Sequence, residues 1–216
     1  MLGLLVKDLR LLSNQKQFFA VTVLISIFLV MSGQQVSFAV MYCTMIAIYF
    51  TISTISYDEY NNGYAFLFTM PITRKQYAVE KYLFALVTGG VTWFVTTGAG
   101  FFYERMRDDL VASEWFMESA SVFFILLVVM CFMIPIQLKF GAEKGRIALF
   151  VLVFAVMAVA MLVQKGFSKM QISMKGMDAF LNMNATGVML FFGIVFILFV
   201  TISILVSIRI VEKKEF

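Results

Sequence analysis

The 216-residue sequence contains no histidine. Without an imidazole, the chain cannot build a Ser-His-Asp or Cys-His nucleophilic site, and the usual zinc motifs lose a ligand. A G-x-x-x-x-G-K-S/T phosphate loop is also missing, because the stretch Gly141–Arg146 has neither its spacing nor its Lys-Ser/Thr end. These absences predict a chain that is not an enzyme and holds no metal or cofactor of its own.

Charged residues are scarce as well. Asp, Glu, Lys and Arg make up 14% of the sequence and apolar types 62%, with 25 Phe and a mean hydropathy of +0.92. A soluble domain has about 25% charged residues, and a water-soluble fold of this length could not bury so much apolar surface. The composition therefore predicts a membrane protein.

Only two cysteines are present, Cys43 and Cys131, and each lies within an apolar run. Two such residues provide no disulfide framework. A free cysteine in this setting behaves as a small buried hydrophobe. The cysteines therefore say little about the compartment, and we expect both to be buried.

Six apolar runs are free of Lys, Arg, Asp and Glu. A run of about 20 apolar residues can cross the hydrocarbon core as a helix, so we predict a single all-α, polytopic transmembrane domain over 1–216. A proton or ion relay needs an ionisable group within the bilayer, and the uncharged runs therefore argue against a proton-coupled pump. The predicted transmembrane helices are 18–33, 36–56, 82–103, 119–138, 147–163 and 188–208.

The distribution of Lys and Arg sets the orientation. With both termini in the cytoplasm, 12 of the 17 basic residues lie on the inner side, as the positive-inside rule requires. The net charge of +4 is then explained by orientation and anionic headgroups, and nucleic acid is not an expected partner. We predict a multi-pass protein of the cell membrane.

Two further segments are amphipathic. Residues 1–16 carry a leucine stripe that predicts an interfacial elbow helix, although a cytosolic extension of the first span is an alternative. Residues 164–186 form a Met-rich amphipathic segment outside the cell, in which Met170, Met174 and Met177 suit an adaptable apolar surface better than a copper(I) site. The third run contains glycines that we interpret as close-packing sites: Gly89, Gly90, Gly98 and Gly100.

Segment 57–81 lies between the second and third runs. An aromatic and apolar stripe at offsets 0, 3, 7, 10 and 11 predicts a short helix, which Asp58 and Glu59 would start and Met70-Pro71 would end. Thr73 and Gln76 then match a capping box for a new helix that continues into the third span. The alternative is an interfacial loop with tyrosines at the headgroup level. The stripe consists of Tyr57, Tyr60, Tyr64, Leu67 and Phe68.

This segment resembles the type-2 ABC transporter permeases, most closely the small six-span bacterial members that include peptide and toxin exporters and bacteriocin immunity components. Met70 and Tyr60 depart from the common pattern. The resemblance implies that 57–81 carries a coupling helix, which docks on a separate ATPase subunit. The residues that it assigns to ATPase coupling are Tyr57, Asp58, Glu59, Tyr60, Gly63, Tyr64, Leu67, Phe68, Pro71, Thr73, Arg74, Tyr77 and Lys81.

The resemblance also implies the function and the partners. The chain would be the permease subunit of a bacterial ABC exporter, paired with a second permease copy as a homodimer or heterodimer among membrane lipids, with ATP and Mg²⁺ bound by the partner ATPase. Span hydroxyls such as Thr44, Thr51, Thr92, Thr96 and Ser203 suggest an amphiphilic or hydrophobic cargo, for example a peptide. The alternative is a substrate-capturing or antimicrobial-sensing immunity subunit associated with an ABC ATPase.

Overall fold

The computed structural model describes residues 2–60, 63–107, 112–170 and 185–214, and all regular structure within these ranges is helical. The predicted all-α fold is therefore confirmed for this part of the chain. The described elements are α1 (Leu2–Asn14), α2 (Lys16–Met31), α3 (Val36–Glu59), α4 (Gly63–Leu67), α5 (Arg74–Met106), α6 (Ala112–Met170) and α8 (Ala185–Lys213).

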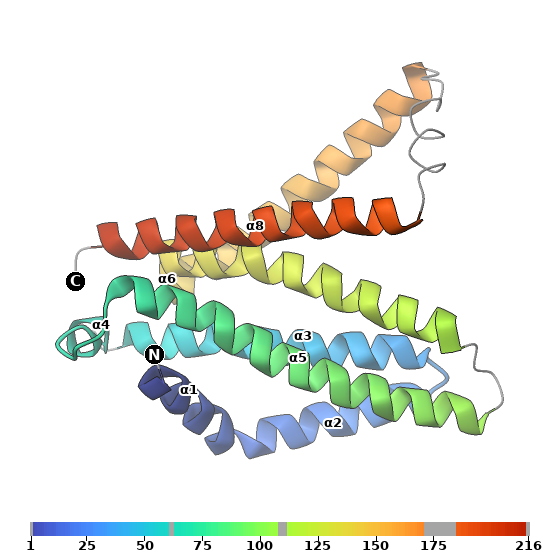
Figure 1. Cartoon of the computed structure of the whole chain (residues 1–216), viewed down its shortest axis with the longest axis horizontal. Helices are drawn as coiled ribbons and strands as arrows, with labels where there is room; N and C mark the ends of the chain where they lie inside the picture. Colours follow the sequence, from blue (N-terminus) through green and yellow to red (C-terminus); the bar gives the residue numbers. More distant parts are fainter. Residues whose placement is uncertain (1, 61–62, 108–111, 171–184, 215–216) are drawn as a thin grey trace.

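The first three helices are joined by two short connections. Around Gln15, α1 and α2 meet at a bend of 64°. Between the predicted helices 18–33 and 36–56 the chain makes a tight turn: Gly33 has a φ of 86°, and the amides of Gly33 and Gln34 each donate to α2 carbonyls at 3.2 Å. Glycine adopts this backbone conformation without strain. As a result, α2 and α3 lie side by side as a helical hairpin (Figure 1).

One residue divides α6 into two helical parts. Gly141 has φ 76° and ψ −176°, which other residues rarely adopt. Figure 1 shows that the chain turns back here, so parts 112–140 and 142–170 run in different directions. The expected connection Lys139–Arg146 is thus mostly helical. Of the predicted outer segment 164–186, the backbone is helical up to Met170, and Met174 and Met177 lie outside the described residues.

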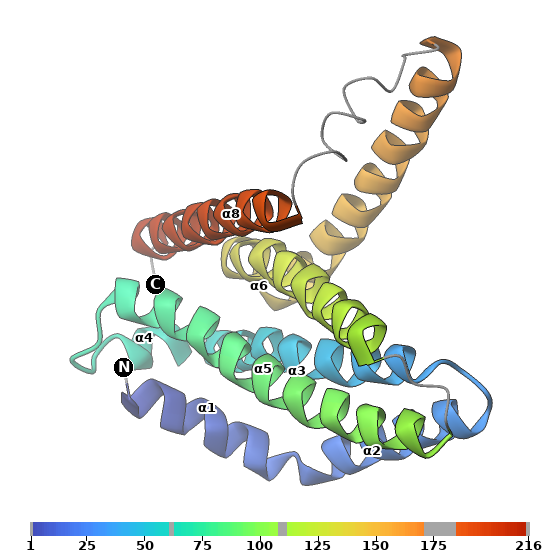
Figure 2. The ribbon, with the colours of Figure 1, turned by 45° about the vertical axis from the view of Figure 1, so that its right-hand side comes forward.

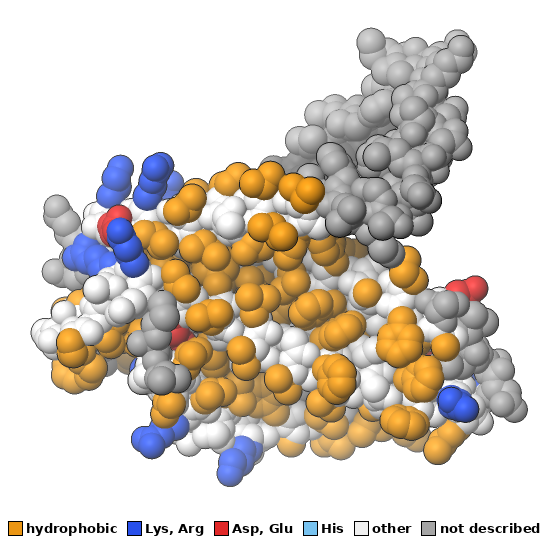
Figure 3. Space-filling view, in the orientation of Figure 1, with side chains coloured by type: hydrophobic (Ala, Val, Ile, Leu, Met, Phe, Trp, Pro, Cys, Tyr) orange, Lys and Arg blue, Asp and Glu red, His pale blue; other side chains and the backbone are white. Residues whose placement is uncertain are grey.

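Several described helices could cross a membrane. Val36–Glu59, Arg74–Met106 and Glu114–Gly141 each meet the length and apolarity required, and the bent pair of α1 and α2 would add a fourth if it forms one span. In Figure 3, apolar side chains cover most of the visible face. Among the exposed apolar side chains of the chain, Phe28, Phe94 and Ile197 are 69%, 75% and 63% exposed. Soluble proteins rarely expose such a continuous apolar surface. The chain is therefore a multi-pass membrane protein.

The main core lies where α3, α5, α6 and α8 meet (Figure 2). Ile55, Met130 and Ile134 are among its fully buried side chains. Cys43 and Cys131 are also buried and free, as predicted. Polar contacts join the helices inside this core, since the Tyr82 hydroxyl bonds to Ser203 and Ser207 of α8 at 2.6 and 2.8 Å.

Three of the span hydroxyls taken as a sign of the cargo have partners within the protein, whereas the buried Thr51 hydroxyl has none among the described residues. Thr44 and Thr96 donate to carbonyls four residues earlier in their own helices. Ser203 contacts Tyr82 and donates to the Cys131 carbonyl. Because these groups stabilise the bundle itself, they are poor evidence for the chemistry of a cargo.

The α5 glycines differ in how closely their neighbours approach. A Cβ on Gly100 would lie 2.6 Å from the Trp115 ring and 2.9 Å from Val36, and one on Gly89 would lie 2.7 Å from Ile48. By contrast, Gly90 meets one atom at 4.0 Å and Gly98 has nothing within 4 Å. The close-packing interpretation is therefore right for Gly89 and Gly100 and wrong for Gly90 and Gly98.

We expect Gly100→Leu to lower the free energy of unfolding by about 1–3 kcal/mol, because overpacking displaces Trp115 and Val36. Gly98→Leu is the matched control on the same helix, and should change stability far less because its site is open. Denaturant unfolding in mixed micelles measures both variants. Equal losses would contradict the packing difference between the two sites.

Candidate functional site

Segment 57–81 is built from the end of α3, the short helix α4 and the start of α5. Thr73 caps α5: its side chain accepts the Gln76 amide, and the Gln76 side chain accepts the Thr73 amide, each at 3.2 Å. This confirms the predicted capping box and a helix that continues through Lys81. Pro71 is exposed in the turn before it.

The predicted start of the short helix is wrong. Tyr57, Asp58 and Glu59 form the last turn of α3, and α4 begins only at Gly63. The two carboxylates therefore lie at a helix C-terminus, where the dipole disfavours negative charge. Asp58 is compensated there by direct contacts with Lys7 and Lys81, so contacts with distant lysines allow α3 to continue.

One face of α4 packs inward. Tyr64 and Leu67 are 5% and 8% exposed, and Tyr77 of α5 is fully buried. The Tyr64 ring lies 6.3 Å from Phe68 and 5.7 Å from Tyr77 between centroids. Such aromatic contacts add about 0.5–1.5 kcal/mol beyond burial, and burial raises the pKa of Tyr64 well above its usual range. Tyr64 and Leu67 of the predicted stripe are therefore internal, and Phe68 is half-buried beside them.

Other side chains of segment 57–81 are exposed. Tyr60 and Phe66 are 73% and 68% exposed, and Tyr57 and Met70 are also largely accessible. Phe66 was missed by the sequence analysis because it lies off the aromatic stripe. Its position beside the inward-facing residue Leu67 is the signal that could have identified it. We call Tyr60, Phe66 and Met70 the exposed α4 surface.

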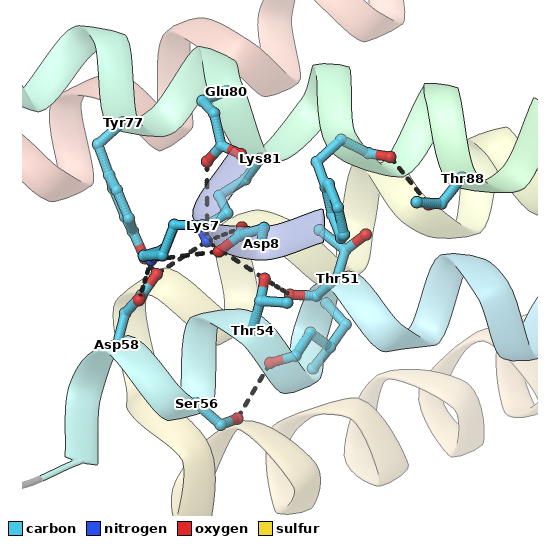
Figure 4. A network of polar contacts seen from close by, with 12 residues as sticks. Lys7, Asp8, Thr51, Thr54, Ser56, Asp58, Tyr77, Glu80, Lys81 and Thr88 are labelled. Atoms are coloured by element: carbon cyan, nitrogen blue, oxygen red, sulfur yellow. Dashed lines mark hydrogen bonds and ion pairs between the residues drawn. The ribbon is translucent and has the colours of Figure 1, made fainter. Parts of the chain in front are cut away.

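Charged side chains from α1 and segment 57–81 meet in the protein interior (Figure 4). The Lys81 ammonium is fully buried and lies 2.5 Å from Asp8 of α1 and 2.8 Å from Asp58 of α3. It also donates to Thr54 at 3.2 Å, while Lys7 of α1 donates to Asp58. These contacts join α1, α3 and α5 at a single point.

Two more residues complete this charge cluster. The Tyr77 hydroxyl donates to Asp58 at 3.1 Å. Glu80 is fully buried 3.7 Å from Lys81, and within the described part of the chain its carboxylate oxygens have no hydrogen-bond partner. The cluster therefore holds three carboxylates and two ammonium groups. Sequence analysis missed Lys7, Asp8 and Glu80 as site residues, because no local pattern links them.

The remaining predicted residues point elsewhere. Arg74 donates to carbonyls at the end of α8, and Glu59 lies 3.4 Å from Lys214. Gly63 lies so close to the Asp58 carbonyl that a Cβ would approach it to 2.6 Å. A bulky residue at Gly63 would consequently distort the turn. A substitution such as Gly63→Trp would therefore change the local fold as well as any docking surface.

Segment 57–81 combines a largely buried charge cluster with an exposed apolar surface. Among the described residues, no group of His, Cys, Asp and Glu is arranged to hold a metal ion. Most of the charge cluster is buried, with Lys81, Asp8 and Glu80 fully buried, whereas the Lys7 side chain is 33% exposed. What the segment offers to its surroundings is an exposed apolar surface on a helix attached at both ends to long membrane helices.

Comparison with known proteins identifies the family. The family model described as ABC-2 family transporter protein matches residues 3–212, from α1 into α8. Neither curated proteins nor solved structures gave a match. The match covers nearly the whole chain, as the resemblance in the motif of 57–81 and in the overall layout predicted. The chain therefore belongs to the ABC-2 family and is the membrane permease subunit of an ABC transporter.

Proposed function

We propose that this permease exports an amphiphilic or hydrophobic cargo, such as a peptide, using ATP hydrolysed by a separate ABC ATPase. The observation that carries the proposal is the exposed α4 surface, formed by Tyr60, Phe66 and Met70 between two helices long enough to span the membrane. Aromatic residues and Met are enriched at protein interfaces. ATP and Mg²⁺ would be bound by the ATPase, since the sequence contains no phosphate loop.

Six spans and a cytoplasmic position of both termini form part of the proposal. The spans would lie within α2, α3, α5, the two parts of α6, and α8, with 1–16 as the elbow helix and 57–81 inside the cell. Figure 1 supports this orientation, because both chain ends and α4 lie at the same end of the molecule. Lys and Arg also gather at that end of the face seen in Figure 3, as the positive-inside rule requires.

Coupling would pass from α4 into the membrane. Closure of the ATPases would push on the exposed α4 surface, and the buried contacts of Tyr64 with Tyr77 would transmit that push to α5. Because α5 is a continuous helix from Arg74 to Met106, displacement at its start would tilt its outer end. Two copies of the permease, identical or related, would enclose the path.

An apolar hollow of about 290 Å³ supports a hydrophobic cargo. It lies between α2, α3 and α5 and is lined mainly by apolar side chains such as Val30, Val40 and Ala99. Binding pockets for small ligands have volumes from about 300 Å³ upward and are largely apolar. The hollow is thus suited to part of an amphiphile rather than to a polar solute.

Purification with an ABC ATPase, to be sought in the neighbouring reading frames, tests the proposal. We expect a stable complex whose ATP turnover exceeds that of the ATPase alone, and ATP-driven uptake of a fluorescent amphiphilic peptide into inside-out vesicles. Absence of any complex would refute the ATPase partnership. A complex that turns over ATP without moving amphiphilic peptides would instead favour the sensing or immunity role.

A further inference from the structure

The C-terminal end of α8 is bound by the first residue of α5. Arg74 donates through Nη1 to the carbonyls of Glu212 and Lys214 at 2.6 and 3.0 Å, with the Val211 carbonyl at 3.4 Å. The last carbonyls of a helix have no partner within it. The Arg74 guanidinium therefore donates hydrogen bonds to carbonyls that have no partner within α8.

Helix electrostatics explain why an arginine is found at this position. As the first residue of α5, Arg74 lies at a helix N-terminus, where the dipole disfavours positive charge. At the C-terminus of α8 the dipole favours it. The positive charge of Arg74 therefore stabilises the C-terminus of α8 and not the N-terminus of its own helix. Lys75 adds a surface ion pair to Glu212 at 3.7 Å.

A second cation connects the same tail to segment 57–81. Just beyond α8, Lys214 lies 3.4 Å from the Glu59 carboxylate of α3 and 3.4 Å from the Leu138 carbonyl of α6. Its ammonium also lies 5.0 Å from the centroid of the Tyr64 ring of α4. Through Arg74 and Lys214, the end of α8 therefore contacts α3, α4, α5 and α6.

We propose that Arg74 and Lys214 form a relay that moves α8 together with segment 57–81 during the transport cycle. This inference rests on the proposed function and extends it. Movement at the start of α5 would then also be transmitted to α8, whose end lies 137 or more residues further along the chain. Arg74 is a positioning residue in this view. It acts by holding the end of α8, and not by contacting the ATPase.

Spin labels on the permease–ATPase complex in proteoliposomes test the relay. The spin labels are attached to an unnatural ketone amino acid, and each sample carries two of them. One label replaces the exposed Leu24 of α2 as a reference, and the other replaces either Phe94 of α5 or Ile197 of α8, so that the α2–α5 and α2–α8 distances are measured separately. ATP with vanadate should change both distances in the wild type. In Arg74→Gln the α5 change should persist and the α8 change should disappear, while Arg107→Gln, an exposed arginine at the other end of α5, should behave as wild type.

A covalent tether separates the relay from direct docking. Lys75→Cys and Glu212→Cys, in a background lacking Cys43 and Cys131, can be joined by a short bis-maleimide across their ion pair. If Arg74 acts by holding α8, the tether should restore the α8 distance change to Arg74→Gln. If Arg74 instead contacts the ATPase, the tether should restore nothing, and that result would overturn the relay.

The two proposals fail in different ways. An α8 distance that still changes in Arg74→Gln would refute the relay while leaving the exporter proposal intact. A wild-type complex in which ATP changes neither distance would refute the coupling route proposed through α4 and α5. Circular dichroism and elution volume identify any variant that fails to fold. For such a variant, Lys214→Gln replaces Arg74→Gln, with the same loss of α8 movement expected.

Discussion

Lys81→Met is expected to lower the free energy of unfolding by about 3–5 kcal/mol, the usual loss when one partner of a buried ion pair is removed. The substitution preserves much of the side-chain volume and removes the charge. Within the described part of the chain, Asp8, which is fully buried, and Asp58 would then keep only Lys7 as a cationic partner. Equilibrium unfolding in mixed micelles measures the loss.

The matched control is Lys75→Met on the same helix. Lys75 is exposed and forms only a surface ion pair at 3.7 Å, for which about 1 kcal/mol or less is expected. Similar losses for the two variants would show that burial of Lys81 does not determine its contribution.

A double-mutant cycle identifies the partner. Because Asp8→Asn removes one of the carboxylates that Lys81 neutralises, the loss in the Lys81→Met/Asp8→Asn protein should be smaller than the sum of the single losses. Groups in contact typically couple by about 0.5–3 kcal/mol. Additive losses would argue that the contact at 2.5 Å contributes little to stability.

Phe66→Asp is expected to weaken ATPase binding by about 30-fold or more, which corresponds to the 2 kcal/mol or more of an interface hot spot. The side chain is 68% exposed, so the change should leave the permease fold intact. At an apolar interface, however, it would bury an unpaired carboxylate. Titration of the purified permease with its ATPase measures the affinity.

The control adds the same charge elsewhere. Asn14→Asp places a carboxylate at an exposed position near the end of α1, outside the exposed α4 surface, and should leave ATPase affinity close to wild type. A similar loss in both variants would indicate a general charge effect. Wild-type affinity in Phe66→Asp would exclude the exposed α4 surface as the docking site.

Local patterns in the sequence predicted several elements correctly. The Thr73 to Gln76 capping box forms as expected, because its hydrogen bonds connect residues three positions apart. The turn at Gly33 likewise depends on neighbouring residues. Apolar runs of membrane length can be found by scanning the sequence, since they depend only on local composition. The cap and the turn depend on residues a few positions apart, and the apolar runs on composition over about 20 residues.

The division of segment 57–81 into two faces could be predicted only in part. Spacing placed Tyr64 and Leu67 on one stripe with Tyr57 and Tyr60. The break after Glu59 separates them: the first pair is buried, whereas Tyr57 and Tyr60 are exposed. Helical periodicity applies only while the helix is continuous, and segment 57–81 contains parts of three helices.

By itself, the sequence determined an all-helical membrane protein, and the resemblance in segment 57–81 pointed to the ABC permeases. Only the tertiary structure decided that Lys81 and Arg74, both predicted to serve the ATPase, contact other helices of their own chain. Lys81 meets Asp8 across 73 positions, and Arg74 meets Glu212 across 138. Contacts over such distances depend on how α1, α3, α5 and α8 pack together, and no pattern within a single helix encodes that packing.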